Sequence, residues 1–290
     1  MYNVIFWAAF LAIAFLSLAI TTCLVHPLSK YFKNSPLSSV VDIVLLPVIA
    51  LTLMACITHL LPAYTPVVKM KNTSGQQLVF VGVQHVATEE YYGSVNALVT
   101  SLRNKEFTVL HEGVGSSGDV SITLKSCATS KVAASSWGLV VQPTCLGELH
   151  AGDVYADITQ EEFSSLYTDF FQAELGVSED EAKSLVVDKV IEIHKNRDSL
   201  LNDFTSYLGL KIASLKVTLY YWSIDSDIEP REEEDPVIMT ARNIKLAQYI
   251  SSRKNAATIY GLDHLPGVIK ELRKNDSTWS VEIIDRIRVL

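Results

Sequence analysis

The sequence lacks formal charge throughout its first 29 residues, which contain no Asp, Glu, Lys or Arg, and again over residues 43–68. Each stretch supplies the roughly 20 apolar residues that are needed to cross the hydrocarbon core of a bilayer. We therefore expect transmembrane helices near residues 4–24 and 38–61. Together they predict a membrane hairpin over residues 1–61 that anchors the chain in a lipid bilayer.

A signal peptide and a soluble hairpin are weaker interpretations of these apolar stretches. A cleavable signal peptide would begin with a basic segment and end at a small-x-small site, but the leader Met1-Tyr2-Asn3 has no basic residue and no such site precedes a mature domain. A soluble hairpin would require a large core to enclose two helices that are apolar on every face. Pro47 is also tolerated more readily in a membrane helix than in a soluble one.

Basic residues are scarce relative to acidic ones. Of the 24 Lys and Arg and the 32 Asp and Glu, only Lys30, Lys33 and Asp42 lie within residues 1–61, so the rest of the chain is about nine charges negative. Binding to nucleic acid needs a basic surface that replaces the phosphate counterions. We therefore expect no nucleic-acid partner.

The same lysines bear on membrane orientation. Lys30 and Lys33 lie between the expected spans, and the positive-inside tendency places such a loop in the cytoplasm. Lys69 and Lys71, which follow the second span, weaken this bias. The expected localisation is a two-pass membrane protein whose larger domain is extracytoplasmic.

Cysteine is rare, with four residues in the chain. Cys23 and Cys56 fall in the expected spans, which leaves Cys127 and Cys145 for the rest of the protein. These two can form a disulfide in an oxidising compartment or remain separate thiols, and the sequence leaves both open. Neither has a second Cys or His at the short spacing of a zinc knuckle.

Residues 62–76 contain two prolines, an asparagine and a glycine, and this composition predicts a linker between the membrane hairpin and a domain over residues 77–290. That domain begins with an apolar run at residues 77–83. Helical spacing follows over residues 89–104, and a second apolar run covers residues 107–110. A strand, a helix and a strand at this spacing predict a parallel βαβ unit.

Further along the chain, Thr159 with Glu162 three residues later predicts a capped helix. The remaining pattern predicts strands and helices in alternation. The expected elements are a strand at residues 137–142, helical periodicity over residues 179–219, a helix at residues 236–253, and strands at residues 256–260 and 279–289.

One local pattern occurs twice. An apolar strand ends in Gly-x-x-His at residues 82–85 and again at residues 261–264. Glycine at the first position lets the backbone turn without a Cβ clash. The repetition predicts two related halves, and the fold class is therefore expected to be α/β, with a mixed, mostly parallel sheet, flanking helices and two pseudo-symmetric halves.

Ligands of open α/β sheets bind beyond the carboxyl ends of the parallel strands. His85, Glu112 and His264 all follow predicted strands at such ends. Two imidazoles and a carboxylate suit a catalytic divalent metal such as zinc, manganese or cobalt, which generates hydroxide from bound water. Without a metal, the same groups can act as a general base and its orienting partner. His111 is the alternative to Glu112 as the residue that faces the site, because adjacent residues of a strand point to opposite faces and only one of the two can do so.

Four segments together resemble the TraB/TIKI/GumN group, which is more distantly related to erythromycin-esterase and ChaN-like proteins. They are GVQH at residues 82–85, HEG at residues 111–113, Arg242-Asn243 and GLDHLPG at residues 261–267. The resemblance covers roughly residues 77–289 and implies an α/β fold with a common cleft, in which TIKI members are regarded as metal-dependent, membrane-tethered proteases.

The resemblance carries over residue by residue. It implies that His85, Glu112 and His264 face the cleft and that Arg242 lies near it. Arg242 would hold a substrate carboxylate or a developing oxyanion; an ordinary helix salt bridge is the alternative. Gln142 and Asp157 match positions where related bacterial sequences have polar residues, and these two positions fit the resemblance least closely.

The hypothesis from sequence is a membrane-anchored, metal-dependent hydrolase. Its catalytic residues would be Glu112, His85, His264 and Arg242, with the metal on His85, His264 and Glu112, and its substrate a peptide or a small ester or amide. A metal-free, esterase-like hydrolase is one alternative. A non-catalytic protein that binds a peptide or signal in the cleft is another. Nothing in the sequence sets the oligomeric state.

Overall fold

The computed structural model describes residues 19, 22, 61–84, 86–112, 138–141, 150–187, 204–223 and 236–290. The expected membrane hairpin therefore lies outside the described residues, apart from the helical Ala19 and Thr22 and from Leu61 at its end. No helix among the described residues has the length and apolar character that a membrane span requires.

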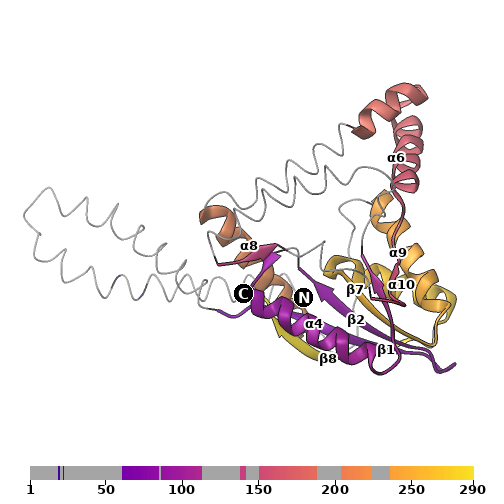
Figure 1. Ribbon diagram of the computed structural model, residues 1–290. Helices are drawn as coiled ribbons and strands as arrows, with labels where there is room; N and C mark the ends of the chain where they lie inside the picture. Colours follow the sequence, from indigo (N-terminus) through magenta and orange to yellow (C-terminus); the bar gives the residue numbers. More distant parts are fainter. Residues whose placement is uncertain are drawn as a thin grey trace, which may run out of the picture.

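A six-stranded sheet forms the centre of the fold (Figure 1). Its strand order is β6-β4-β7-β2-β1-β8. Strands β6, β4, β7 and β2 are parallel to one another, whereas β1 pairs antiparallel with both β2 and β8. The fold is thus α/β with a mixed, mostly parallel sheet, as we expected. The strands span Tyr64–Lys71 (β1), Gln77–Val83 (β2), Thr108–His111 (β4), Val154–Tyr155 (β6), Asn255–Gly261 (β7) and Ser280–Arg288 (β8).

Strand β1 corrects one prediction, because it occupies most of the segment that we expected to be a linker. It forms an inner strand between β2 and β8. Pro66 favoured a linker, since proline removes a ladder donor. In the structure the pairing with β8 shifts register between Val67 and Val68, beside that proline. A bulge of this kind is one of the few places in a sheet where proline is tolerated.

Helices cover both faces of the sheet. The alternation along β2 shows this directly, since Val79 and Val81 pack in one apolar cluster and Leu78 and Phe80 in another. Helix α4 (Glu89–Arg103) covers the first face. Helices α9 (Pro236–Ser251) and α10 (Leu265–Asn275), drawn in orange and gold in Figure 1, cover the second face. Burial on both faces explains why the parallel strands are continuous apolar runs in the sequence.

Helices α4 and α6 each begin with a capped first turn. Thr88 accepts a hydrogen bond from the Tyr91 N–H at the start of α4. Thr159 and Glu162 form a complete capping box at the start of α6 (Gln160–Leu175), which confirms the predicted cap. These contacts satisfy N–H groups that the first turn of a helix leaves without a partner in the helix itself.

Two further regions complete the described structure. Helix α8 (Phe204–Ser223) packs beside β1, where the Tyr64 N–H donates to Thr218 Oγ1 at 2.8 Å. Residues 179–187 are also helical. Within the range expected to be a strand at residues 137–142, the described residues include β5 (Val140–Val141), which pairs with the equally short β3 (Val86–Ala87) in a separate two-stranded sheet.

Candidate active site

The register of the sheet brings three strand ends together. Val83 of β2 pairs with Gly261 of β7, and His111 of β4 pairs with Ile259 of the same strand. Strands β2, β7 and β4 therefore end side by side, at what we call the carboxyl edge. The residues that follow them in the sequence, including Glu112, begin at this edge.

Two of the three predicted metal ligands meet there. His264 Nε2 lies 3.8 Å from Glu112 Oε1, although the two residues belong to segments far apart in the sequence. His85 lies outside the described residues; its described neighbour Gln84 follows the end of β2. The structure brings His264 and Glu112 close together, whereas their role as metal ligands and the placement of His85 stay predictions.

Both oxygens of Glu112 are engaged. Oε2 accepts a hydrogen bond from the Gly261 N–H at the end of β7. Oε1 accepts one from Arg242 Nη2, at 2.6 Å. The Glu112 side chain is 13% exposed. This carboxylate therefore joins the end of β4 to the end of β7 and to helix α9.

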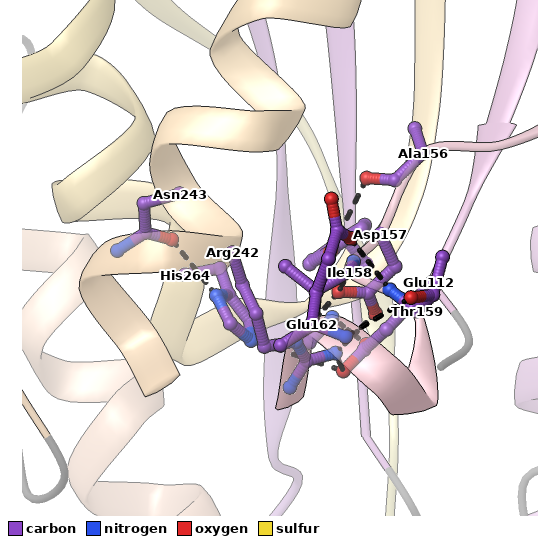
Figure 2. Close-up of polar contacts among 11 residues, drawn as sticks. Glu112, Ala156, Asp157, Ile158, Thr159, Glu162, Arg242, Asn243 and His264 are labelled. Atoms are coloured by element: carbon purple, nitrogen blue, oxygen red, sulfur yellow. Dashed lines mark hydrogen bonds and ion pairs between the residues drawn. The ribbon is translucent and has the colours of Figure 1, made fainter. Parts of the chain in front are cut away.

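Arg242 lies between two carboxylates, as Figure 2 shows. Besides its bond to Glu112, its Nε donates to Asp157 Oδ1 at 2.8 Å and its Nη2 donates to Asp157 Oδ2 at 2.6 Å. We call Glu112, Asp157 and Arg242 the ion cluster. Two-point pairing of this kind is the strongest arrangement available to an arginine and a carboxylate. The sequence left an ordinary helix salt bridge as the alternative role for Arg242. The observed ion pairs instead connect Arg242 to Glu112 and Asp157, in other parts of the fold.

The protonation states of the ion cluster follow from its burial and charges. Burial alone would raise the pKa of Asp157, but the hydrogen bonds and charge of Arg242 hold it below its ordinary value. Burial alone would lower the pKa of Arg242, but Asp157 and Glu112 raise it above its ordinary value. Asp157 is therefore an anion and Arg242 a cation at neutral pH.

Tyr260 supports the cluster from β7. Its ring faces the guanidinium, with Arg242 Cζ 5.5 Å from the ring centroid. Burial, followed by the negative charge of Asp157, raises the pKa of the Tyr260 phenol, which therefore stays neutral. Sequence reasoning missed this role, because a tyrosine inside an apolar strand has the pattern of a core residue.

His264 is held on two sides. It ends the short 3-10 helix η2 (Leu262–His264), and it is 3% exposed. Its Nδ1 lies 2.8 Å from Asn243 Oδ1 of helix α9. Its ring packs edge-on against Tyr260, with centroids 4.8 Å apart and planes at 88°. These contacts fix the imidazole with its Nε2 on the side of Glu112.

Packing favours glycine at both first positions of the repeated motif. Neither Gly82 nor Gly261 has a positive φ angle. The backbone turn that we expected glycine to permit therefore does not explain these residues, and the close approach of neighbouring atoms does. A Cβ on Gly261 would lie 3.2 Å from Glu112 Oε2. A Cβ on Gly82 would overlap Leu262 Cδ1, closer than real contacts of this type. Both glycines allow neighbouring groups at the carboxyl edge to approach.

His111 is paired outside the ion cluster, which resolves its competition with Glu112. Its Nε2 lies 2.8 Å from Asp153 Oδ2, and Arg103 of α4 also donates to that carboxylate. Burial alone would raise the pKa of Asp153, but Arg103 and His111 hold it below its ordinary value. This second group of charges joins α4 to the end of β4.

The structure describes only some of the remaining predicted residues. Asp157, which the resemblance picked out, belongs to the ion cluster, whereas Gln142, Cys127 and Cys145 lie outside the described residues. Asn243 was part of a predicted motif, but sequence reasoning assigned it no role. In the described part of the chain, no group of three or more His, Cys, Asp or Glu side chains could hold a metal ion. The predicted metal site, which includes His85, stays a prediction.

A scan against protein-family models found no match for this chain, and searches among curated proteins and among solved structures found no significant match either. The fold and the geometry of the carboxyl edge therefore define the class: an α/β protein with a histidine and a buried ion cluster at the ends of its parallel strands.

Proposed function

We propose that this chain is a membrane-anchored, metal-dependent hydrolase whose active site is the carboxyl edge. The observation that carries the proposal is the 3.8 Å distance between His264 Nε2 and Glu112 Oε1. Two residues from distant parts of the sequence meet at the edge where α/β proteins bind ligands. Hydrolysis requires opposite charges close together, and Glu112 and Arg242 place an acidic and a basic side chain at this edge.

The proposed metal is zinc, manganese or cobalt, bound by His85, His264 and Glu112. The donor chemistry of the described residues fits, because His264 has its Nδ1 against the Asn243 oxygen and its Nε2 on the side of Glu112. Metal-bound histidines are usually held in this way through their second nitrogen. When bound, the metal would lower the pKa of a water molecule to about 7 and supply hydroxide.

In this proposal Arg242 stabilises the negative charge that develops on the substrate during hydrolysis. Its Nε and Nη2 are fixed by the two carboxylates, and its Nη1 carries two more N–H donors. A guanidinium that is already oriented can stabilise the oxyanion that develops on a carbonyl under attack, without reorganisation. The proposed substrates are accordingly carbonyl compounds: a peptide, or a small ester or amide.

The resemblance to the TraB/TIKI/GumN group supports the same proposal through its two Gly-x-x-His motifs, its strand-end acid and its helix arginine. In this proposal the chain has two pseudo-symmetric halves, each with one strand-Gly-x-x-His unit. The hairpin over residues 1–61 anchors it in the bilayer, and the larger domain lies on the extracytoplasmic side.

Metal content tests the proposal directly. The full-length protein is purified, exposed to zinc, manganese or cobalt, desalted and analysed for bound metal. We expect about one ion per chain, lost in the double variant His85→Ala/His264→Ala and retained in His150→Ala, which changes an exposed histidine elsewhere in the fold. Equal metal content in the double variant and in the unchanged protein would overturn the metal site.

One observation favours a metal-free hydrolase as a second candidate. Both Glu112 oxygens already accept hydrogen bonds, from Gly261 and from Arg242. Glu112 would then orient Arg242, and His264 would be the general base for water. Hydrolysis of peptide and ester libraries separates the candidates, since activity that survives chelation supports the second and activity lost on chelation supports the first. A peptide that binds and is recovered intact contradicts both.

A further inference from the structure

We propose that Lys211, Ser214 and Arg288 bind the phosphate group of an anionic membrane lipid, at the end of the domain where the chain leaves the expected hairpin. The inference rests on the proposed function for its membrane, since the hairpin over residues 1–61 brings the lipid to this site. Helix α8 supplies the first two residues and strand β8 the third, and the two elements lie side by side near the C-terminus in Figure 1.

Lys211 and Ser214 are buried polar residues without a partner in the described part of the chain. Each is 2% exposed, and their spacing of three positions puts both side chains on one side of α8. The Ser214 hydroxyl makes no hydrogen bond. Burial and the positive charge of Arg288 lower the pKa of Lys211 to about 8, and no described carboxylate offsets them. Buried charges in native proteins are usually paired, so this ammonium and this hydroxyl together indicate an anionic ligand.

Arg288 reaches the same place from β8. It pairs with Tyr64 of β1, whose N–H donates to Thr218 Oγ1 of α8 at 2.8 Å. Thr218 lies seven positions after Lys211, which is about two helical turns, and it is buried on the same side of the helix. Arg288 Nε donates to the Leu290 backbone oxygen at 3.4 Å. No described residue accepts from its two Nη groups, which are therefore available to a ligand.

The charge of this region has the sign that an anionic ligand requires. The domain over residues 62–290 is about nine charges negative, yet α8 contains two lysines and no acidic residue. Arg286, two positions before Arg288 on β8, has a buried Nε without a hydrogen-bond partner in the described structure. A phosphate group has enough oxygens to accept from an ammonium, a guanidinium and a hydroxyl at once, and such charge-assisted bonds are strong.

The position of the site relative to the hairpin favours a lipid over a soluble anion. The expected second span ends at Leu61, and Tyr64, the partner of Arg288, follows three residues later. Three extended residues span at most about 10 Å, and the headgroup layer beyond the hydrocarbon core is roughly 5–8 Å thick. Arg288 is thus close to the depth of the lipid phosphates. A lysine such as Lys211 can bury its apolar stem and direct its ammonium toward this layer.

Thermal unfolding of the full-length protein in a neutral detergent tests the site. The probes are phosphatidylglycerol, phosphatidylcholine with the same acyl chains, and inorganic phosphate. A ligand that binds only the folded state raises the Tm. We expect phosphatidylglycerol to raise the Tm by roughly 5–10 °C at about 100 times its Kd, and phosphatidylcholine or phosphate to raise it less. Lys211→Met and Ser214→Ala should each lose most of this lipid-dependent rise.

Lys216→Gln is the matched control, because it removes an exposed lysine from the same helix. It should keep the full rise. An equal rise in Lys211→Met and in the unchanged protein, or no rise with any probe, would overturn the site. A rise with inorganic phosphate as large as that with phosphatidylglycerol would overturn the lipid as the ligand. Ser214→Ala is the smaller change and decides the test if Lys211→Met does not fold.

The outcome is separable from that of the proposed function. Metal content and hydrolysis report on the carboxyl edge, and Lys211→Met should leave both unchanged. Extraction of membranes with alkaline carbonate tests the hairpin by itself, because an integral membrane protein stays in the pellet. A chain released into the supernatant would count against the membrane anchor. A chain that stays in the pellet but shows no lipid-dependent rise in Tm would count against the lipid site alone.

Discussion

Arg242 binds Asp157 through two parallel hydrogen bonds, 2.8 Å from Nε to Oδ1 and 2.6 Å from Nη2 to Oδ2, and the Asp157 side chain is fully buried. The pair connects helix α9 to the segment that follows β6. It also holds the guanidinium in the orientation in which it reaches Glu112. Removal of either partner therefore affects both the stability of the fold and the geometry of the carboxyl edge.

We predict that Asp157→Ala lowers the free energy of unfolding by about 3–5 kcal/mol, because it leaves a buried guanidinium with one carboxylate. Urea denaturation of the full-length protein measures this. Glu179→Gln removes an exposed i,i+4 pair with Lys183 and serves as the control, with no measurable loss expected. A loss for Asp157→Ala no larger than that for the control would show that the ion cluster does not stabilise the fold.

The same carboxylate predicts a pH dependence. The pKa of Asp157 is lower in the folded protein than its ordinary value of 3.8. The folded state therefore binds this proton less readily than the unfolded chain, so the stabilisation is full above pH 3.8 and is lost as the pH falls below it. Denaturation curves from neutral pH down into this acid range should show the loss in the unchanged protein. The slope should be smaller in Asp157→Asn, and an identical acid slope would contradict the assignment.

The contact between positions 82 and 262 predicts that substitutions of Gly82 and Leu262 have non-additive effects on stability. Gly82→Ala should cost about 1–3 kcal/mol of stability, because the new methyl group overlaps Leu262. Leu262→Ala alone should cost about 2–5 kcal/mol through the cavity that it leaves. In the double variant the methyl group fills part of that cavity. The double variant should therefore cost at least about 0.5 kcal/mol less than the two single costs together.

Gly93→Ala is the control for this double-mutant cycle. Gly93 is an exposed residue of α4, and a Cβ there would meet no other atom within 4 Å. The substitution should stabilise the protein by about 0.5–1 kcal/mol, because alanine favours a helix interior over glycine. Simple additivity of the Gly82 and Leu262 costs would mean that the two side chains do not compete for space.

The burial of Lys211 predicts that the stability of the fold changes at high pH. Lys211 is a buried residue of α8, and burial together with the positive charge of Arg288 lowers its pKa from 10.5 to about 8. Between these values the unfolded chain binds more protons than the folded protein, so stability should rise as the pH rises from 8 toward 10.5. Lys211→Met should be more stable than the unchanged protein at neutral pH and should lack this rise. A parallel pH profile in Lys211→Met would contradict the prediction.

Much of the fold could be predicted from sequence because its signals are local. Strand β2 begins and ends where the apolar run does, and the capping box at Thr159 consists of residues three apart. The strand expected at residues 256–260 corresponds to β7. Strand β1 was missed, because its Pro66 is compatible with a linker unless the neighbouring strand and its bulge are known.

The candidate site was predictable only in part. Glu112 and His264 were selected because they follow strands, and the sheet places them together. The partners of those residues were not predictable in this way. Asp157 is separated from Arg242 by 85 positions, and Asn243 from His264 by 21 positions. No periodicity along the chain connects such pairs, since they belong to different elements whose packing sets the distance.

Sequence alone was enough to indicate most of the strands and helices, a helix cap, and the residues that stand at the carboxyl ends of the strands, because each depends on neighbours within a few positions. The sharing of Arg242 by Glu112 and Asp157, and the contact of Asn243 with His264, depend instead on the packed domain. Those contacts exist because α9 packs on one face of the sheet and reaches the ends of β4 and β7. That arrangement is set by burial of apolar surface over the whole domain.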